Sequence, residues 1–211
     1  LSNICQNIPD ANIDDIAKTI GLDPRIGRLF LNAGPGYGGS CLPKDMKALI
    51  NFANTRGVTP TLLNAVEDVN TKQLEQIISI IRKRLGDLTS KRITILGTAF
   101  KPNTDDIRDS IAIELIKKLQ KRKVDVIIHD PKAMENTKRV FGNKIKYGRT
   151  VVDELSKNQC VIIMTQWKQY EKLNNSQFKN MKRKFVIDSR RMLSDKQLDV
   201  DYFAIGLGKE K

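Results

Sequence analysis

Four short apolar runs in the second half of the chain constrain its fold more than any other feature. They are rich in β-branched residues and have the length of buried strands: RITIL (92–96), VDVIIHD (124–130), CVIIMT (160–165) and KFVIDS (184–189). Segments with helical character alternate with them, as in SIAIELIKKLQ (110–120) and TVVDELSK (150–157). This alternation predicts a mostly parallel sheet covered by helices, with ligands near the carboxyl ends of the strands.

The first half of the chain reads as helices and loops. NIDDIAKTIG (12–21) has apolar residues at helical spacing before a glycine, and Pro43 suits the first turn of a helix through 44–57. A long helix from about 61 to 85 joins the two parts. We therefore expect an α/β fold, in which a helical region (1–88) is joined by a long helix to a Rossmann-like domain (89–211).

Charge and composition exclude several classes of protein. The net charge is +13, with basic clusters at 117–123 and 179–184. We interpret them as solvated surface rather than a nucleic-acid site, because aromatic residues make up 6% and none lies within either cluster. Three cysteines without close spacing predict neither disulfides nor a zinc site, and so a reducing cytoplasm. No apolar run exceeds the length of a strand, so we expect neither a membrane span nor a signal peptide.

The loop GPGYGGSCLPKD (34–45) raises the question of what its glycines do. They spell the dinucleotide fingerprint G-x-G-x-x-G, but a poor strand precedes them and no acidic residue follows about 20 positions later, so we reject that reading. The alternative is that the glycines bring backbone close to a ligand and present Cys41 at a helix start. The helix dipole and Lys44 would favour a thiolate there, and Asp45 lies one turn later. Cys41 is thus a candidate nucleophile, against the alternative of a small buried cysteine.

The presumed ligand edge of the sheet carries further basic candidates. The loop GTAFKPNTDDIRDS (97–110) has one glycine and lacks the usual pyrophosphate turn, but Lys101 and Arg108 within it suit two phosphate groups. The alternative is that both pair with the aspartates of the same loop. Arg190 and Arg191 follow the strand at 184–189. Cys5 and Cys160 are expected in the core, and the lone His129 is weak evidence for a metal.

Four ordered segments carry a family resemblance: GLDPRIGRLFLNAGPG, GPGYGGSCLPKD, ILGTAFKPNTDDIRDS and IDSRRML. Together they resemble the UDP-glucose 6-dehydrogenase family, within the UDP-glucose/GDP-mannose dehydrogenases. Such enzymes have an N-terminal NAD-binding domain, a central helical dimerisation region and a C-terminal domain that binds the nucleotide sugar. This sequence resembles the last two, at 1–88 and 89–211. The resemblance implies a homodimer, UDP-glucose as substrate, NAD as cofactor bound mainly by a domain absent here, and a chain inactive alone.

The resemblance also implies roles for individual residues. Cys41 matches the catalytic cysteine, which holds the C6 aldehyde and then a thioester, and Asp45 matches the aspartate that handles water and protons. Lys44 and Arg108 face the NAD side, and Arg25 reaches the partner's substrate. The remaining substrate contacts are Phe30, Leu31, Asn32 (a lysine in some members), Tyr37, Gly38, Leu42, Phe100, Lys101 and one of Arg190 and Arg191. GDP-mannose or UDP-N-acetylmannosamine dehydrogenase and a non-catalytic nucleotide-sugar-binding module are the alternatives.

Overall fold

The computed structural model describes residues 1–151, 155 and 158–208. Its centre is a six-stranded sheet of order β3-β2-β1-β4-β5-β6, in which every neighbouring pair is parallel. The four expected strands are present as β1 (Arg92–Leu96), β2 (Asp125–His129), β4 (Cys160–Ile163) and β5 (Phe185–Asp188). Sequence reasoning missed the two edge strands, β3 (Lys146–Tyr147) and β6 (Asp201–Ala204). The order is that of the doubly wound Rossmann fold, so the predicted α/β class is confirmed.

Each face of the sheet buries its own apolar cluster. Ile93, Ile95 and Ile162 face one cluster, while Val161 and Ile163 face the other, as alternation along buried strands requires. The helices around the sheet are α5 (Ile111–Gln120), α6 (Met134–Phe141) and α8 (Asn175–Phe178), with short 3₁₀ turns at Gly142–Lys144 and Tyr170–Lys172. The helix expected over 150–157 lies largely outside the described residues.

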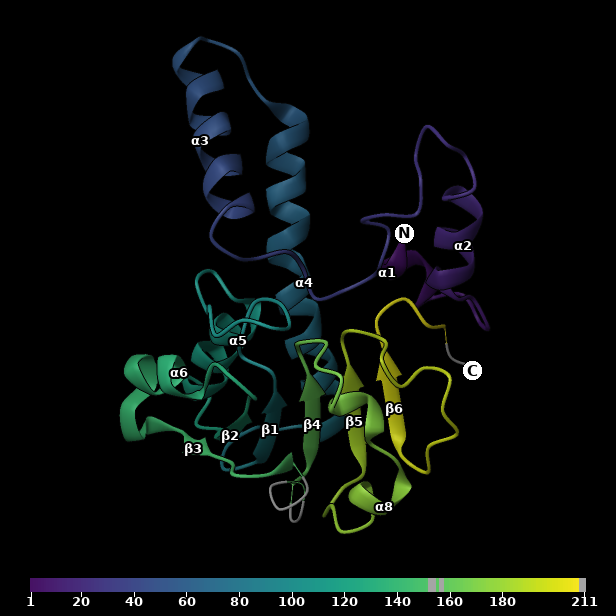
Figure 1. The fold of residues 1–211 in the computed structure, drawn as a ribbon, viewed down its shortest axis with the longest axis vertical. Helices are drawn as coiled ribbons and strands as arrows, with labels where there is room; N and C mark the ends of the chain where they lie inside the picture. The colour runs from purple at the N-terminus through teal and green to yellow at the C-terminus, as the bar shows by residue number, and fades with distance from the viewer. Residues whose placement is uncertain (152–154, 156–157, 209–211) are drawn as a thin grey trace.

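A helical hairpin rises from the sheet (Figure 1). It consists of α3 (Leu42–Thr55) and α4 (Thr61–Leu85), which confirms the long connecting helix. Only the second half of α4 is buried, through a stripe that belongs to the same apolar cluster as Ile93 and Ile95 of β1: Leu74, Ile77, Ile78, Ile81 and Leu85. The second half of α4 is therefore held by packing against the sheet. The domain boundary at 88 stays a prediction.

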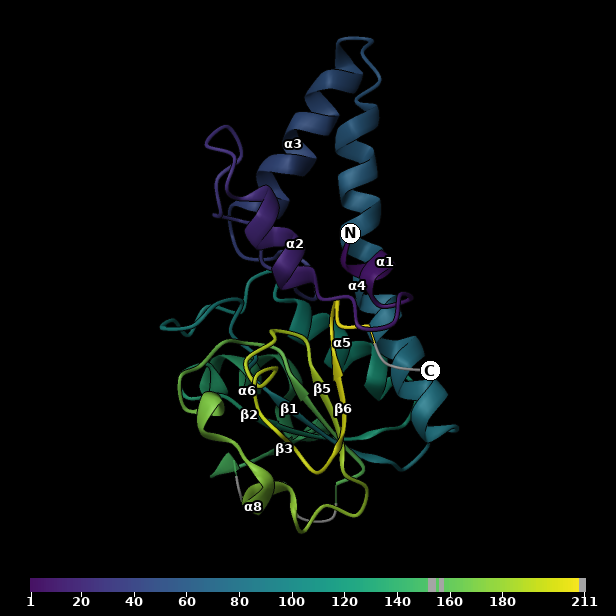
Figure 2. The ribbon, with the colours of Figure 1, turned by 90° about the vertical axis from the view of Figure 1, so that its right-hand side faces the viewer.

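The N-terminal segment is attached to the edge of the sheet formed by β6. It contains α1 (Ser2–Cys5) and α2 (Ile13–Ile20), and the side chain of Asn12 caps α2 by accepting from Asp14 N. Asn12 forms an antiparallel bridge with Leu207, directly after β6. Figure 2 places α1 beside α4, where Gln76 Nε2 donates to Gln6 Oε1 at 2.9 Å. Among the described residues, we find no helix whose length and apolar character suit a membrane crossing.

Candidate active site

Cys41 lies at the start of α3, in the loop that connects α2 to the hairpin. It is the exposed one of three free cysteines, since Cys5 and Cys160 are buried as predicted. Cys41 is the N-cap residue of α3, and its carbonyl accepts from Asp45 N at 2.9 Å. The Asp45 carboxylate pairs with Lys44 Nζ at 2.8 Å, and both side chains are exposed. The structure thus presents a thiol at a helix N-terminus, with a carboxylate and an ammonium one turn away.

A second cation, Arg108, interacts electrostatically with Cys41. Arg108 is bonded to Asp106, which holds the pKa of Arg108 above its ordinary value, and the charge of Cys41 contributes to the same shift. The pKa of Lys44 is likewise raised, mainly by Asp45 and in small part by Cys41. Lys44 and Arg108 are therefore both close enough to Cys41 to feel its charge, and Arg108 also pairs within its own loop, as the alternative expected.

The glycines of the loop allow the close approach of two predicted residues, Phe100 and Arg190, from different parts of the chain. A Cβ added at Gly39, where φ is +94°, would lie 2.6 Å from the ring of Phe100. One added at Gly34 would lie 3.0 Å from a terminal nitrogen of Arg190. Lys101 Nζ lies 5.3 Å from the centroid of the Phe100 ring. The loop thus passes directly over the carboxyl edge of the sheet, where ligands of such folds bind.

The two adjacent arginines have different environments. All three guanidinium nitrogens of Arg191 donate hydrogen bonds within the chain. The acceptors are Asp14 Oδ2 at 2.8 Å, Asn12 Oδ1 at 2.6 Å and the carbonyl of Ile205 at 2.9 Å. Arg190 donates through Nε to the carbonyl of Met164 at 2.8 Å. Its guanidinium head faces the glycine loop, and burial lowers its pKa to about 10, so it stays charged at neutral pH. Arg191 joins α2 to the sheet, whereas Arg190 faces the candidate site.

The Asp130 side chain fixes the loop that carries Phe100 and Lys101 through hydrogen bonds. The sequence analysis did not identify this role of Asp130. Its carboxylate is 2% exposed and accepts five hydrogen bonds, from Thr98 N (2.7 Å), Ala99 N (3.0 Å), Lys132 N (2.9 Å), Ala133 N (2.7 Å) and Trp167 Nε1 (3.2 Å). An acidic residue at the end of β2 holds the ribose of a dinucleotide in many Rossmann folds. Here that carboxylate is already occupied, and a Cβ at Gly97 would meet Thr165. The β1 turn of this sheet does not fit a dinucleotide.

The other predicted substrate residues are mostly exposed or have partners elsewhere in the described structure. Phe30 is 95% exposed, and Arg25 is exposed and bonded to Asp23. Asn32 is exposed, Leu31 is half-buried, and Leu42 is 55% exposed on α3. Gly38 packs against the Asp109 carbonyl, and the Tyr37 hydroxyl donates to Glu67 on α4. Whether these side chains contact substrate stays a prediction.

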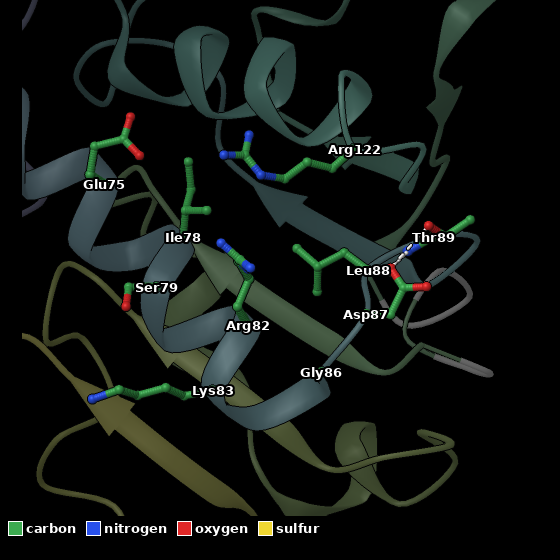
Figure 3. Close-up of a pocket in the computed structure, with 10 residues that line it drawn as sticks. All are labelled: Glu75, Ile78, Ser79, Arg82, Lys83, Gly86, Asp87, Leu88, Thr89 and Arg122. Atoms are coloured by element: carbon green, nitrogen blue, oxygen red, sulfur yellow. Dashed lines mark hydrogen bonds between the residues drawn. The ribbon is translucent and has the colours of Figure 1, made fainter.

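A groove of about 960 Å³ lies elsewhere (Figure 3). It runs between the end of α4 and the turn after α5, with Arg82 and Arg122 among its lining residues. Gly86 to Thr89, which also line it, precede β1, so the groove lies at the amino edge of the sheet. A smaller pocket of about 550 Å³, lined by Asp106 and Arg108, lies beside the β1–α5 loop. We therefore locate the candidate site at the carboxyl edge and not in the larger groove.

No cluster of histidine, cysteine, aspartate and glutamate suited to a metal occurs in the described part of the chain. His129 is buried instead, and its Nδ1 lies 3.0 Å from the Tyr170 hydroxyl. Burial lowers the pKa of His129, which keeps the imidazole neutral.

The geometry defines a Rossmann-like protein that presents a cysteine at the ligand edge of its sheet. Comparison with known proteins gives its family. Residues 1–72 match the central domain of the UDP-glucose/GDP-mannose dehydrogenase family, and residues 94–195 match the UDP binding domain of the same family. The chain belongs to this family.

Individual relatives agree with that assignment. The chain is 41% identical over 202 residues to UDP-glucose 6-dehydrogenase AglM of Haloferax volcanii, covering 96% of this chain and 46% of the relative. It is 37% identical to a UDP-glucose 6-dehydrogenase of Rickettsia conorii, covering 98% and 49%. A UDP-glucose dehydrogenase structure from Pyrobaculum islandicum superposes with a TM-score of 0.86 at 35% identity, covering 94% and 44%. The chain spans about half the length of the relatives it matches.

Proposed function

We propose that this chain binds the nucleotide sugar and supplies the catalytic thiol in an NAD-dependent UDP-glucose 6-dehydrogenase, which oxidises the C6 alcohol of UDP-glucose to a carboxylate. The observation that carries the proposal is the position of Cys41, in a glycine loop held against Phe100 and Arg190 at the ligand edge of the sheet. The names of the relatives support the choice of substrate.

Substrate binding rests on charge and packing. Arg190 and Lys101 are the proposed partners of the pyrophosphate, because both are cations at the carboxyl edge and Arg190 has donors left after its bond to Met164. Phe100 and the glycine backbone form the wall beside the sugar. The segment with Phe30, Leu31 and Asn32 completes the site, together with Tyr37, Gly38 and Leu42.

Cys41 does the covalent work in this proposal. Its thiolate adds to C6 of the aldehyde, the carbonyl electrons move to oxygen, and that oxygen takes a proton, so the half-oxidised sugar stays bound. After the second oxidation a water attacks the thioester, Asp45 receives one proton of that water, and the C–S bond breaks to release the thiolate and a carboxylic acid, which loses the second proton to solvent and leaves as the carboxylate. NAD⁺ supplies the hydride acceptor for both oxidations.

The dinucleotide is held mainly outside residues 1–211, since the turn after β1 does not fit it and Asp130 is occupied by backbone donors. Lys44 and Arg108 are the proposed contacts from this chain to the cofactor. We therefore expect no turnover from the 211-residue chain with NAD⁺ and UDP-glucose, measured as NADH absorbance. Sustained NADH formation would contradict this part of the proposal.

We further propose a homodimer in the cytoplasm, where the three free thiols stay reduced. The helical hairpin exposes large apolar side chains that a second copy would cover: Leu49, Phe52, Val58, Leu62 and Val69. Arg25 would then reach the partner's substrate. Sedimentation equilibrium tests the dimer, and a monomer at all accessible concentrations would exclude it.

Calorimetric titration tests the substrate. UDP-glucose is expected to bind more tightly than GDP-mannose or UDP-N-acetylmannosamine, and Arg190→Gln is expected to weaken it at least about tenfold, as loss of a charged hydrogen bond does. Arg82→Gln, in the groove at the opposite edge, is the matched control and should leave binding unchanged. Tightest binding of GDP-mannose would assign the chain to a different member of the family.

A non-catalytic binding module is the second candidate, favoured by the misfit of the dinucleotide. The two candidates differ at Cys41. The protein is incubated with the 6-aldehyde of UDP-glucose and analysed by native mass spectrometry without chemical reduction. We expect a thiohemiacetal adduct in the wild type and none in Cys41→Ala. Binding without any Cys41-dependent adduct would favour the module.

A further inference from the structure

Among the described residues, Tyr37 makes the hydrogen bonds that attach the loop carrying Cys41 to α4. The side-chain amide of Asn70 makes two hydrogen bonds to the backbone of Tyr37. Asn70 Oδ1 accepts from Tyr37 N at 2.8 Å, and Asn70 Nδ2 donates to Tyr37 O at 3.1 Å. Glu67, one turn earlier on the same helix, accepts a hydrogen bond from the Tyr37 hydroxyl. Three hydrogen bonds thus fix one residue that lies four positions before Cys41.

The glycines around Tyr37 are fitted to this attachment. Gly36 has φ of +119°, and a Cβ there would lie 2.6 Å from Asn70 Oδ1. On the other side, a Cβ at Gly38 would strike the carbonyl of Asp109, and one at Gly39 would lie 2.6 Å from the Phe100 ring. At Gly36, Gly38 and Gly39 the loop therefore lies so close to α4 and the β1–α5 loop that a side chain larger than hydrogen would clash.

The helix that provides this attachment is itself fixed to the sheet. Asn70 lies one turn before Leu74, which begins the buried stripe of α4, and Ile77 and Ile78 follow with 1% and 2% exposure. The position of Asn70 is therefore set by the same core that positions β1 and the loop carrying Phe100. Asn70 couples Cys41 to the substrate-facing edge of the sheet.

We propose that Asn70, assisted by Glu67, is a positioning residue that places the Cys41 thiol over the sugar of the bound nucleotide sugar. It contacts Tyr37 and acts on the reaction only through the loop. The inference rests on the proposed function for its substrate, but the attachment itself is testable without substrate.

Asn70→Ala removes both backbone hydrogen bonds, and Asn70→Asp keeps the acceptor but brings a carboxylate against the Tyr37 carbonyl. Asn64→Ala is the matched control, because Asn64 lies on the exposed part of the same helix. The nucleotide moiety binds at the sheet edge, so UDP affinity should stay within about threefold of wild type in all three variants. The sugar lies beside the loop, so bound UDP-glucose should no longer protect Cys41 in either Asn70 variant.

The readout is the protection of Cys41 from iodoacetamide, followed by mass spectrometry of the 211-residue chain with saturating UDP-glucose or UDP. We expect UDP-glucose to slow alkylation of the wild type and of Asn64→Ala about tenfold more than it slows the Asn70 variants, since each net hydrogen bond is worth about a factor of ten. Equal protection in wild type and Asn70→Ala would overturn the proposal. So would a parallel loss of UDP affinity, which would indicate general damage.

Hydrogen exchange separates this inference from the proposed function. Without ligand, the Tyr37 amide should exchange at least about tenfold faster in Asn70→Ala than in wild type and Asn64→Ala. Unchanged exchange would refute the attachment even if UDP-glucose binds. Failure of the wild type to bind UDP-glucose would refute the proposed function, and with it the placement of Cys41 over the sugar.

Discussion

Replacement of Asp130 by asparagine tests whether one buried carboxylate organises the ligand edge. The carboxylate accepts five hydrogen bonds, three at Oδ2 and two at Oδ1, and is 2% exposed. Asparagine keeps a single acceptor oxygen and places an NH₂ group where the other oxygen was. Whichever way the amide turns, at least two buried N–H donors then face another donor.

The magnitude follows from those unpaired donors. Each buried donor without a partner costs about 1–3 kcal/mol, so two cost roughly 2–6 kcal/mol. A domain is stable by only about 5–15 kcal/mol, so we expect Asp130→Asn to lower the unfolding midpoint strongly. Urea unfolding followed by circular dichroism measures the whole fold, and the fluorescence of Trp167, the one tryptophan, reports on the same site because its Nε1 is one of the five donors.

Asp68→Asn is the matched control for this change. Asp68 is an exposed aspartate on α4, and its carboxylate lies 3.7 Å from Lys72 Nζ. Exposed pairs of this kind contribute about 0–1 kcal/mol, so the control should unfold close to wild type. A loss smaller than about 1 kcal/mol in Asp130→Asn would refute the reasoning, because it would mean that the five bonds are replaced by water or by relaxation of the loop.

Three further predictions concern single features of the fold. Burial lowers the pKa of His129, the one histidine, so the unfolded chain takes up a proton that the folded chain excludes, and the free energy of unfolding should fall as the pH drops below about 6.5. His129→Gln should remove this component between pH 7.5 and 5.5 in urea titrations, and an unchanged slope would count against it. Gly39→Ala should lower the melting temperature and speed alkylation of Cys41, because it places a Cβ against Phe100 at a positive φ, whereas Gly57→Ala, with a positive φ and open space, should lower the melting temperature only and by less. Arg191→Lys and Asp14→Asn should show coupling of about 1 kcal/mol in a double-mutant cycle of unfolding, and additive effects would exclude the joint between α2 and the sheet.

Features with a local signature could be predicted from the sequence. The four buried strands were predicted from β-branched runs, and α4 from a long stretch of helix formers whose bounds agree with the structure. The loop 34–45 was separated from a dinucleotide site by its flanks alone. The burial of Cys5 and Cys160 and the exposure of Cys41 followed from the neighbouring residues.

Features that depend on distant partners could not be predicted. β3 has two residues and β6 is half-buried along most of its length, so neither has a strong strand pattern and both exist because a neighbour pairs with them. A polar residue at the head of an apolar stripe was the one available signal for Asn70, which precedes Leu74 by one turn. The sequence around Asp130 does not distinguish it from any other acidic residue at a strand end. Its role depends on five donors, three of which come from distant parts of the chain.

The sequence by itself determined the class of fold, the family and the presentation of Cys41, because strand runs, glycines and a proline at a helix start act over a few residues. Only the tertiary structure decided what the adjacent arginines do, since the bond between Arg191 and Asp14 spans 177 positions in the chain. It also decided why the loop needs its glycines, since their neighbours Asn70, Phe100 and Arg190 come from three separate elements. Identical side chains take different roles when the fold uses all three guanidinium nitrogens of one for internal hydrogen bonds and leaves part of the other facing the ligand edge.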